Sequence, residues 1–441
     1  MSYVNYFSRP HLYLRNLCGT LGQFGLFGLL LVSSLITPLS AQQLFIPMDE
    51  RQANHLKAYG LIFNHLTEGG KATWLLNYRG GSFMTDENAA LVREARLKNI
   101  TIEVISSSQA TQITQDVESP GSNTSVVNLE KAPRIAVYTP NQALPWDDAV
   151  TLALSYAEID YDKIWDVEVL QGGLQNYDWL HLHHEDFTGQ YGKFWASYRN
   201  NPWYITQVKQ MEAMATELGF NKVSDQKLAV AKTIKEYVGK GGFLFAMCSG
   251  TDTFDVALAA EGIDIAPTPF DGDPVDPNAQ ESLDYSATLA FENFTISLNP
   301  TEYEHADIDV PVAINEIDQS LDFFTLFEFS AKWDPIPTML TQNHVSSVRG
   351  FYGQTTAFRS DKIKSSVVVL GESPGREQAK YIHGSFGQGT YTFYAGHDPE
   401  DYTHRVNDPP TDLALHPNSP GYRLILNNIL FPAAKKKKQK T

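Results

Sequence analysis

Residues 243–250 read FLFAMCSG, and this stretch decides how the rest of the chain is interpreted. Its first five residues are all apolar, which is typical of a strand buried on both faces of a parallel sheet. Residues 252–260 follow with a helical pattern. Ala246-Met247-Cys248-Ser249-Gly250 therefore has the small–x–Cys–x–small form of a nucleophile elbow, a tight strand-to-helix turn that exposes one side chain above the sheet.

The elbow predicts a reactive role for Cys248. The N-terminus of the following helix lowers the pKa of a thiol placed there and favours the thiolate. The backbone N–H of Ser249 is in the right place to help hold an oxyanion. The alternative is an inert cysteine that ends a core strand.

Strand and helix patterns alternate on both sides of the elbow, which predicts an α/β fold with a flavodoxin-like, three-layer parallel sheet. We assign residues 133–434 to this domain, with a Pro- and Asp-rich insertion at about 262–345. The expected strands are 134–139, 164–170, 178–184, 243–247, 366–370 and 390–395, and the expected helices include an inserted segment at 190–222, 225–238, 252–260 and a closing helix at 421–430.

Three further segments flank this domain. Residues 42–106 alternate strand, helix, strand, helix and strand, which predicts a small N-terminal α/β unit with a parallel sheet. Residues 107–132 are rich in Ser, Thr, Gln and Asn and are interpreted as a linker. Residues 435–441 form a basic tail.

Residues 1–41 read as a signal peptide. Arg9 and Arg15 precede a short apolar run, and the small residues that end at Ala41 favour cleavage there. We therefore expect an exported protein, periplasmic or extracellular, with no stable membrane span after cleavage. The alternative is an N-terminal anchor that stays uncleaved. Cleavage would remove Cys18 and leave Cys248 as the one cysteine, so no internal disulfide could form.

Composition narrows the class of protein further. The chain has 441 residues, 42% of them hydrophobic and 12% aromatic, with two cysteines and a formal net charge of −17. These values exclude a mainly disordered chain, a collagen-like repeat and a disulfide scaffold. The acidic balance argues against a nucleic-acid partner, because binding to that backbone depends on Lys and Arg.

A thiolate nucleophile needs a base and a group that orients the base. His397, at the end of a late predicted strand, is the best candidate for the base, with Asp398 or Glu400 fixing its tautomer. The alternative is a turn histidine that is hydrogen-bonded locally.

The densest group of metal-capable side chains is His181-Leu182-His183-His184-Glu185-Asp186. On a strand His181 and His183 point to the same side, and such a pair can offer two imidazoles to zinc. Alternatively, the histidines shape a binding pocket by hydrogen bonding, without metal. No cofactor is required by the sequence, and zinc is the candidate ion.

The strand–Cys–helix elbow, followed late in the chain by a strand and Gly396-His397-x-Pro-Glu400, resembles the class I glutamine amidotransferase-like fold. That resemblance implies Cys248 as nucleophile, His397 as base and Glu400 as acid. Here His397 and Glu400 are separated by two residues, where the family usually has one. The Gly-His-Asp ending and the closing helix are also similar to ThuA-like proteins, a branch of the fold that is linked to carbohydrate metabolism.

At a finer level the chain resembles a family of exported bacterial proteins often labelled asparagine synthetase B. The resemblance rests on IPMDERQANHLKAYG, WLLNYRGGSF, YDWLHLHHEDFTGQYGKF and GHDPEDYTHRV. The labelled mechanism is not expected, because it uses a cysteine exposed by removal of the initiator Met, and this chain begins Met1-Ser2.

These features favour an exported hydrolase or amidase that acts on a small molecule through Cys248, His397 and Glu400 or Asp398. The alternatives are a non-catalytic module that binds a carbohydrate or another cell-envelope ligand, and a metal-dependent hydrolase. The residues expected to line the substrate crevice are His181, His183, His184, Glu185 and Ser249.

Overall fold

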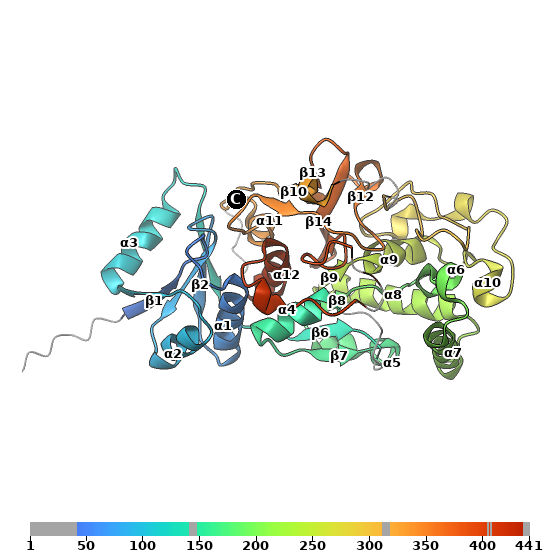
Figure 1. Ribbon diagram of the computed structural model, residues 1–441, viewed down its shortest axis with the longest axis horizontal. Coiled ribbons are helices and arrows are strands. Elements are labelled where there is room, and N and C mark those ends of the chain that lie inside the picture. The colour runs from blue at the N-terminus through green and yellow to red at the C-terminus, as the bar shows by residue number, and fades with distance from the viewer. Residues whose placement is uncertain (1–41, 141–147, 311–317, 404, 406–407, 435–441) are drawn as a thin grey trace, which may run out of the picture. The chain divides into compact units, whose positions relative to one another are not determined.

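The computed structural model describes residues 42–140, 148–310, 318–403, 405 and 408–434. The predicted signal peptide and the basic tail lie outside the described residues, as does Cys18, so export stays a prediction. Within the described residues no helix combines the length and the apolar character that a membrane crossing requires. The fold is mixed α/β, with two separate sheets (Figure 1).

The N-terminal sheet has five strands in the order β4-β1-β3-β2-β5, and all its pairings are antiparallel. The prediction of a parallel sheet here was wrong. Residues 77–81 join β2 to β3 as a hairpin, and so short a connection can join only antiparallel neighbours. The strands are β1 (Gln42–Ile46), β2 (Ala72–Leu76), β3 (Ser82–Asp86), β4 (Glu103–Ser106) and β5 (Ser125–Leu129).

The segment predicted as a linker is folded. It forms helix α3 (Ser107–Glu118) and strand β5, which pairs with β2 along its whole length. A capping box between Ser106 and Gln109 starts the helix, and Ala110 and Val117 are its buried residues. The polar composition therefore reflects an exposed helix face, which sequence composition alone does not distinguish from a linker.

The other helices of this unit are α1 (His55–Thr67) and α2 (Ala89–Leu97). Helix α1 packs against α4 (Ala149–Ala157) and α12 (Pro420–Leu430) of the larger unit. A Cβ atom at Gly60 would lie 1.9 Å from the carbonyl oxygen of Ala157, so the close approach of α1 to α4 requires glycine at this position.

The large sheet has the order β11-β10-β13-β14-β15-β9-β8-β6-β7, with β12 paired to β14. Strands β7, β6, β8, β9 and β15 run parallel, and the strands beyond β15 are antiparallel. The parallel strands are β6 (Ile135–Tyr138), β7 (Asp162–Ile164), β8 (Trp179–Leu182), β9 (Phe243–Met247) and β15 (Gly389–Tyr394). The antiparallel strands are β10 (Phe323–Leu326), β11 (Ser347–Arg349), β12 (Phe358–Arg359), β13 (Val368–Ser373) and β14 (Gln378–Phe386).

Apolar side chains of the parallel strands enter two separate cores. Alternate residues such as Val137 and Phe245 join one core with α4 and α12. Their neighbours, such as Ala136 and Leu244, join the other core with α8 (Val223–Gly239) and α9 (Ser249–Ala259). Helices thus cover both faces of these strands, which explains why β9 contains no polar residue.

Two other segments differ from expectation. Residues 166–170, predicted as part of a strand, form α5 (Asp166–Leu170), because the Glu168 side chain accepts the backbone N–H of Trp165 at 3.0 Å and starts a helix. The predicted insertion at 262–345 contributes β10 to the antiparallel part of the large sheet. The remaining helices are α6 (Trp195–Tyr198), α7 (Pro202–Glu217), α10 (Thr268–Asp271) and α11 (Pro335–Leu340).

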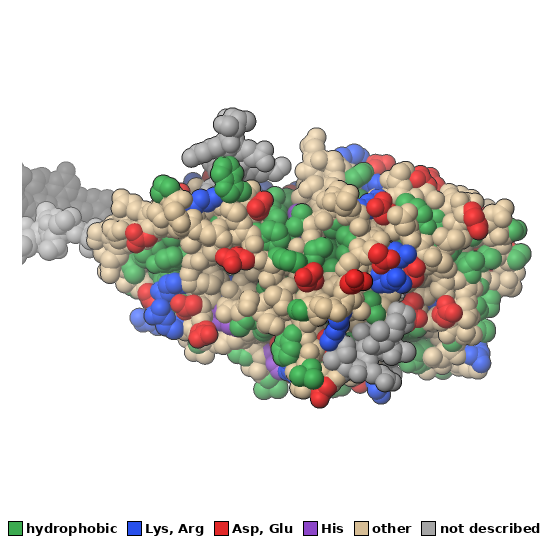
Figure 2. Space-filling model, turned by 90° about the horizontal axis from the view of Figure 1, so that it is seen from above, with side chains coloured by type: hydrophobic (Ala, Val, Ile, Leu, Met, Phe, Trp, Pro, Cys, Tyr) green, Lys and Arg blue, Asp and Glu red, His purple; other side chains and the backbone are tan. Residues whose placement is uncertain are grey.

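The surface agrees with the acidic composition. On the face in Figure 2, Asp and Glu side chains are scattered among neutral ones, and the Lys and Arg side chains that are described form only small groups. This face therefore does not present the continuous basic surface that a nucleic-acid backbone needs.

Candidate functional site

The candidate site lies at the edge of the large sheet where the parallel strands end. His183 and His184 directly follow β8, Cys248 directly follows β9, and His397 lies just after β15. Asp148 is the N-cap of α4, the helix that comes after β6. Because these strands are parallel and adjacent, their carboxyl ends bring the four segments to one edge, as is usual for sites in α/β sheets.

Cys248 has the backbone conformation of an elbow, with φ 49° and ψ −140°. A positive φ is strained for a side chain other than glycine and is common at functional turns. Gly250, two residues later, lies against the end of β8, where its N–H donates to the carbonyl oxygen of His183 at 2.7 Å. A Cβ atom at Gly250 would lie 2.5 Å from that oxygen, so the contact requires glycine. The elbow therefore connects the end of β9 to the end of β8.

The Cys248 thiol is 2% exposed, and its sulfur accepts the backbone N–H of Gln354 at 3.2 Å. Burial raises the pKa of Cys248 to about 11, although backbone N–H groups of Thr355, Gln354 and Ser249 act in the opposite direction. The thiol is therefore neutral at pH 7, contrary to the thiolate expected from the helix N-terminus. Desolvation outweighs the dipole here.

We predict that Cys248 resists alkylation at neutral pH. In a Cys18→Ser background, iodoacetamide should label it at least about 100-fold more slowly at pH 7.5 than an exposed cysteine, because few thiolates form. The matched control is Leu97→Cys in a Cys18→Ser, Cys248→Ala background, since Leu97 is 81% exposed. Similar rates for the two thiols, measured by mass spectrometry, would contradict the prediction.

The other predicted triad residues have different partners. Glu400 Oε2 lies 3.1 Å from Nδ1 of His416. Asp398 Oδ1 accepts the backbone N–H of Glu400 at 2.8 Å and of Asp401 at 3.4 Å. Both carboxylates thus engage their own loop, and within the described residues no hydrogen bond joins the Cys248 sulfur to His397.

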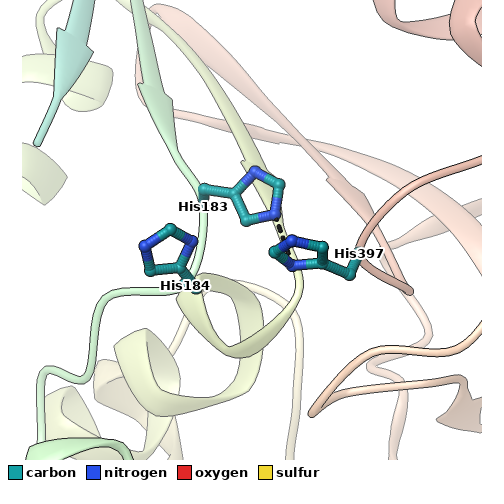
Figure 3. Close-up of side chains that lie close together, drawn as sticks. All are labelled: His183, His184 and His397. Atoms are coloured by element: carbon teal, nitrogen blue, oxygen red, sulfur yellow. Dashed lines mark hydrogen bonds between the residues drawn. The ribbon is translucent and has the colours of Figure 1, made fainter. Parts of the chain in front are cut away.

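A hydrogen-bonded chain of side chains runs through the site instead. Asp148 Oδ1 lies 3.1 Å from Nδ1 of His183, whose Nε2 lies 2.9 Å from Nδ1 of His397. Figure 3 shows the His183 and His397 rings facing each other from separate strand ends, with His184 beside them. Asp148, His183 and His397 therefore form one connected chain.

His181 contacts the same carboxylate. Its Nε2 lies 3.4 Å from Asp148 Oδ1, and its Nδ1 lies 3.1 Å from the carbonyl oxygen of Phe245. The prediction that His181 and His183 point to the same side is confirmed by this shared partner. Burial alone would raise the pKa of Asp148, but His181 and His183 hold it well below its ordinary range.

The remaining predicted residues lie close to this chain. Glu185 Oε2 accepts the backbone N–H of His183 at 3.1 Å, and burial raises the pKa of Glu185 to about 7. Ser249 begins α9, and its buried Oγ has no hydrogen-bond partner among the described residues. A small pocket adjoins His184 and Glu185, and its other lining residues are Pro140, Trp165, Asp186, Tyr191, Gly192, Phe194, Gln207 and Met211.

Sequence reasoning missed the residues that cover the elbow. Gln354 reaches the Cys248 sulfur from a loop 106 positions away, and that loop also accepts the N–H of His397 through the Tyr352 carbonyl at 2.8 Å. The buried Lys380 donates to the Phe351 and Thr356 carbonyls at the two ends of this loop. No local pattern in the sequence signals these contacts.

A second buried polar group lies beside the site. Lys227 Nζ lies 2.9 Å from both carboxylate oxygens of Asp166 and 2.9 Å from the hydroxyl of Tyr138, at the end of β6. Gln226 donates to Asp166 Oδ2 at 2.6 Å. Both members of the ion pair are 1% exposed, and their hydrogen bonds are satisfied, so we interpret this group as structural.

The comparisons with known proteins give no family. No family model matches the chain, and no curated protein matches it. Among solved structures, it is similar to the cytoplasmic protein STM3548 from Salmonella typhimurium, at 10% identity over 69% of this chain and 100% of that chain, with a TM-score of 0.32. It is also similar to the cytoplasmic protein STM1381 from Salmonella typhimurium LT2, at 12% identity over 68% and 99% of the two chains, with a TM-score of 0.32. Likeness at this level carries no argument about function.

Proposed function

We propose that the protein is a hydrolase of small polar molecules, in which water activated by the imidazole cluster of His183, His184 and His397 is the nucleophile. One observation carries the proposal: the Asp148–His183–His397 chain, with separations of 3.1 and 2.9 Å, at the carboxyl edge of the parallel strands. A carboxylate that orients an imidazole, which in turn faces a second group, is the usual arrangement for moving a proton in an active site.

We also propose that the large sheet and its helices form a class I glutamine amidotransferase-like, ThuA-like fold, and the strand order supports this proposal. Taken in chain order, the parallel strands β6, β7, β8, β9 and β15 lie in the sheet as second, first, third, fourth and fifth. This is the order of flavodoxin-like three-layer folds. The position of Cys248 after the fourth of these strands, and of His397 after the fifth, supports the same proposal.

The proposed reaction is hydrolysis of an amide or ester bond. The water oxygen attacks the carbonyl carbon and gives up a proton at the cluster. That proton is delivered to the leaving amine or alcohol as the C–N or C–O bond breaks. The buried position of His183 and His397, at 1% and 6% exposure, keeps competing water away from the transfer.

The test is a hydrolysis assay on the full chain with L-glutamine, L-asparagine and p-nitrophenyl acetate. We expect turnover of at least one of these, and a fall of at least about 100-fold in kcat/KM for His397→Ala. His416→Ala is the matched control and should keep its activity, because His416 contacts Glu400 and not the cluster. Equal loss in both variants, or none in either, would contradict the proposal.

A second candidate is a cysteine hydrolase with Cys248 as nucleophile. The strained elbow, with φ 49°, favours it, because such a turn has a cost that function commonly explains. In this mechanism the sulfur would attack the carbonyl and His397 would take the thiol proton. It requires the loop that contains Gln354 to move away from the sulfur, and the two candidates are separated by substitution of Cys248.

A further inference from the structure

Three imidazoles from two different strand ends converge at the site. One ring nitrogen from each of His183, His184 and His397 lies within 4.8 Å of the others. We propose that these three histidines bind a divalent transition-metal ion, of which zinc is the representative. A role of the ion in catalysis rests on the proposed function, whereas binding of the ion can be measured without turnover.

The spacing of two of the three nitrogens is close to that of two ligands on one such ion. His183 Nε2 and His397 Nδ1 are 2.9 Å apart. Two ligands at the usual zinc–nitrogen distance of about 2.0–2.1 Å in a tetrahedral site are roughly 3.3 Å apart. A shift of a few tenths of an ångström would convert the hydrogen-bonded pair into a pair of metal ligands, provided that the proton on His397 Nδ1 moves to Nε2 of the same ring.

A carboxylate sets the orientation of one ligand. Asp148 Oδ1 accepts from Nδ1 of His183, so the Nε2 of that ring keeps its lone pair and directs it toward His397. Metal-ligating histidines almost always donate their other ring N–H to such a partner. Asp148 is itself fixed, because its Oδ1 accepts the backbone N–H of Val150 at 2.7 Å.

Two other groups of potential ligands are less suitable. The Asp148, His181 and His183 group depends on Asp148 Oδ1, which already accepts the N–H groups of Val150 and Thr151 and lies 3.1 Å from Nδ1 of His183, so an ion there would have to displace these hydrogen bonds.

The other group consists of three aspartates around an existing cation. Lys222 Nζ lies 2.5 Å from Asp264, 3.0 Å from Asp271 and 2.8 Å from Asp273. The ammonium group occupies the position that a metal would take there. Among the described residues, the three histidines are therefore the best candidate site.

The ligand number points to a catalytic type of site. Three protein nitrogens leave the fourth tetrahedral position to water or substrate, whereas structural zinc sites take four protein ligands. His184 is half-buried and lines the small pocket, so one of the three ligands borders an open space. A metal ion held there would lower the pKa of its bound water and so supply a hydroxide nucleophile for the proposed hydrolysis. The three imidazoles would then act as ligands of the ion, and not as the base that accepts the water proton.

The experiment uses the full chain freed of metal with EDTA and then titrated with Zn²⁺ or Co²⁺. We expect one ion per chain by elemental analysis, and visible absorption bands of four-coordinate Co²⁺. His184→Ala should weaken binding at least about 100-fold, and Asp148→Asn by about 10–100-fold. His416→Ala is the matched histidine control and should bind as the wild type does. Circular dichroism of each variant shows whether it is folded.

Each outcome has a definite meaning. No bound ion at micromolar Zn²⁺, or equal binding by the wild type and folded His184→Ala, overturns the inference. If His184→Ala does not fold, the inference is tested by the Co²⁺ spectrum of the wild type and by the Asp148→Asn titration. Absence of four-coordinate Co²⁺ bands, or unchanged binding in Asp148→Asn, would then overturn it. Metal binding without hydrolysis contradicts the proposed function alone, whereas hydrolysis that survives complete metal removal contradicts the inference alone.

Discussion

Replacing Lys227 by methionine should lower the free energy of unfolding by about 3–5 kcal/mol. The substitution keeps a similar volume but removes the cation that neutralises Asp166, and both residues are 1% exposed. Tyr138 and Gln226 would still donate to the carboxylate. A buried charge without its counter-charge nevertheless destabilises the folded state, because most of its desolvation cost is no longer offset. Urea unfolding followed by circular dichroism measures the loss.

The control for this prediction is a surface ion pair. Lys232 pairs with Glu261, and their side chains are 49% and 54% exposed, so Lys232→Met should cost less than about 1 kcal/mol. The double variant Lys227→Met, Asp166→Asn should recover part of the loss, because it removes both charges. If Lys227→Met lowered the free energy of unfolding by less than about 1 kcal/mol, the prediction would be contradicted, and the Lys227–Asp166 pair would be accessible to water in solution.

The second large effect concerns turnover. His183→Gln should lower kcat/KM by about 10²–10⁴-fold, the usual contribution of a positioned acid–base group. Gln can keep one hydrogen bond to Asp148, but it has no titratable nitrogen to face His397. We expect the fall in kcat and not in KM alone, because the reaction needs the imidazole after the substrate is bound. A change in KM only would indicate a role in substrate binding.

Local patterns predicted the parts of the fold that local residues decide. The apolar run at 243–247 and the small residues around Cys248 predicted the strand and the elbow, because both depend on neighbours in the chain. The antiparallel pairing of the N-terminal strands was not predicted, because it depends on the length of the connection between them. No strand was expected at Ser82–Asp86, so the short hairpin before it was not expected either.

The candidate site was predicted only in part, for a similar reason. His183 and His397 could be placed at strand ends, but their contact depends on β8 and β15 both flanking β9, which no single segment specifies. Asp148 is a helix N-cap, which is a local feature, whereas its contact with His183 requires the tertiary fold. Glu400 pairs with His416 because of the loop between them, which carries no recognisable pattern.

The central claim is that the imidazole cluster, and not the thiol, performs the chemistry. The most direct test compares kcat/KM of Cys248→Ala and His183→Gln on the same substrate, with both variants shown to be folded. We predict that Cys248→Ala stays within about threefold of the wild type while His183→Gln falls by at least about 100-fold. Loss of activity in Cys248→Ala, with activity retained in His183→Gln, would contradict the claim and establish the cysteine mechanism.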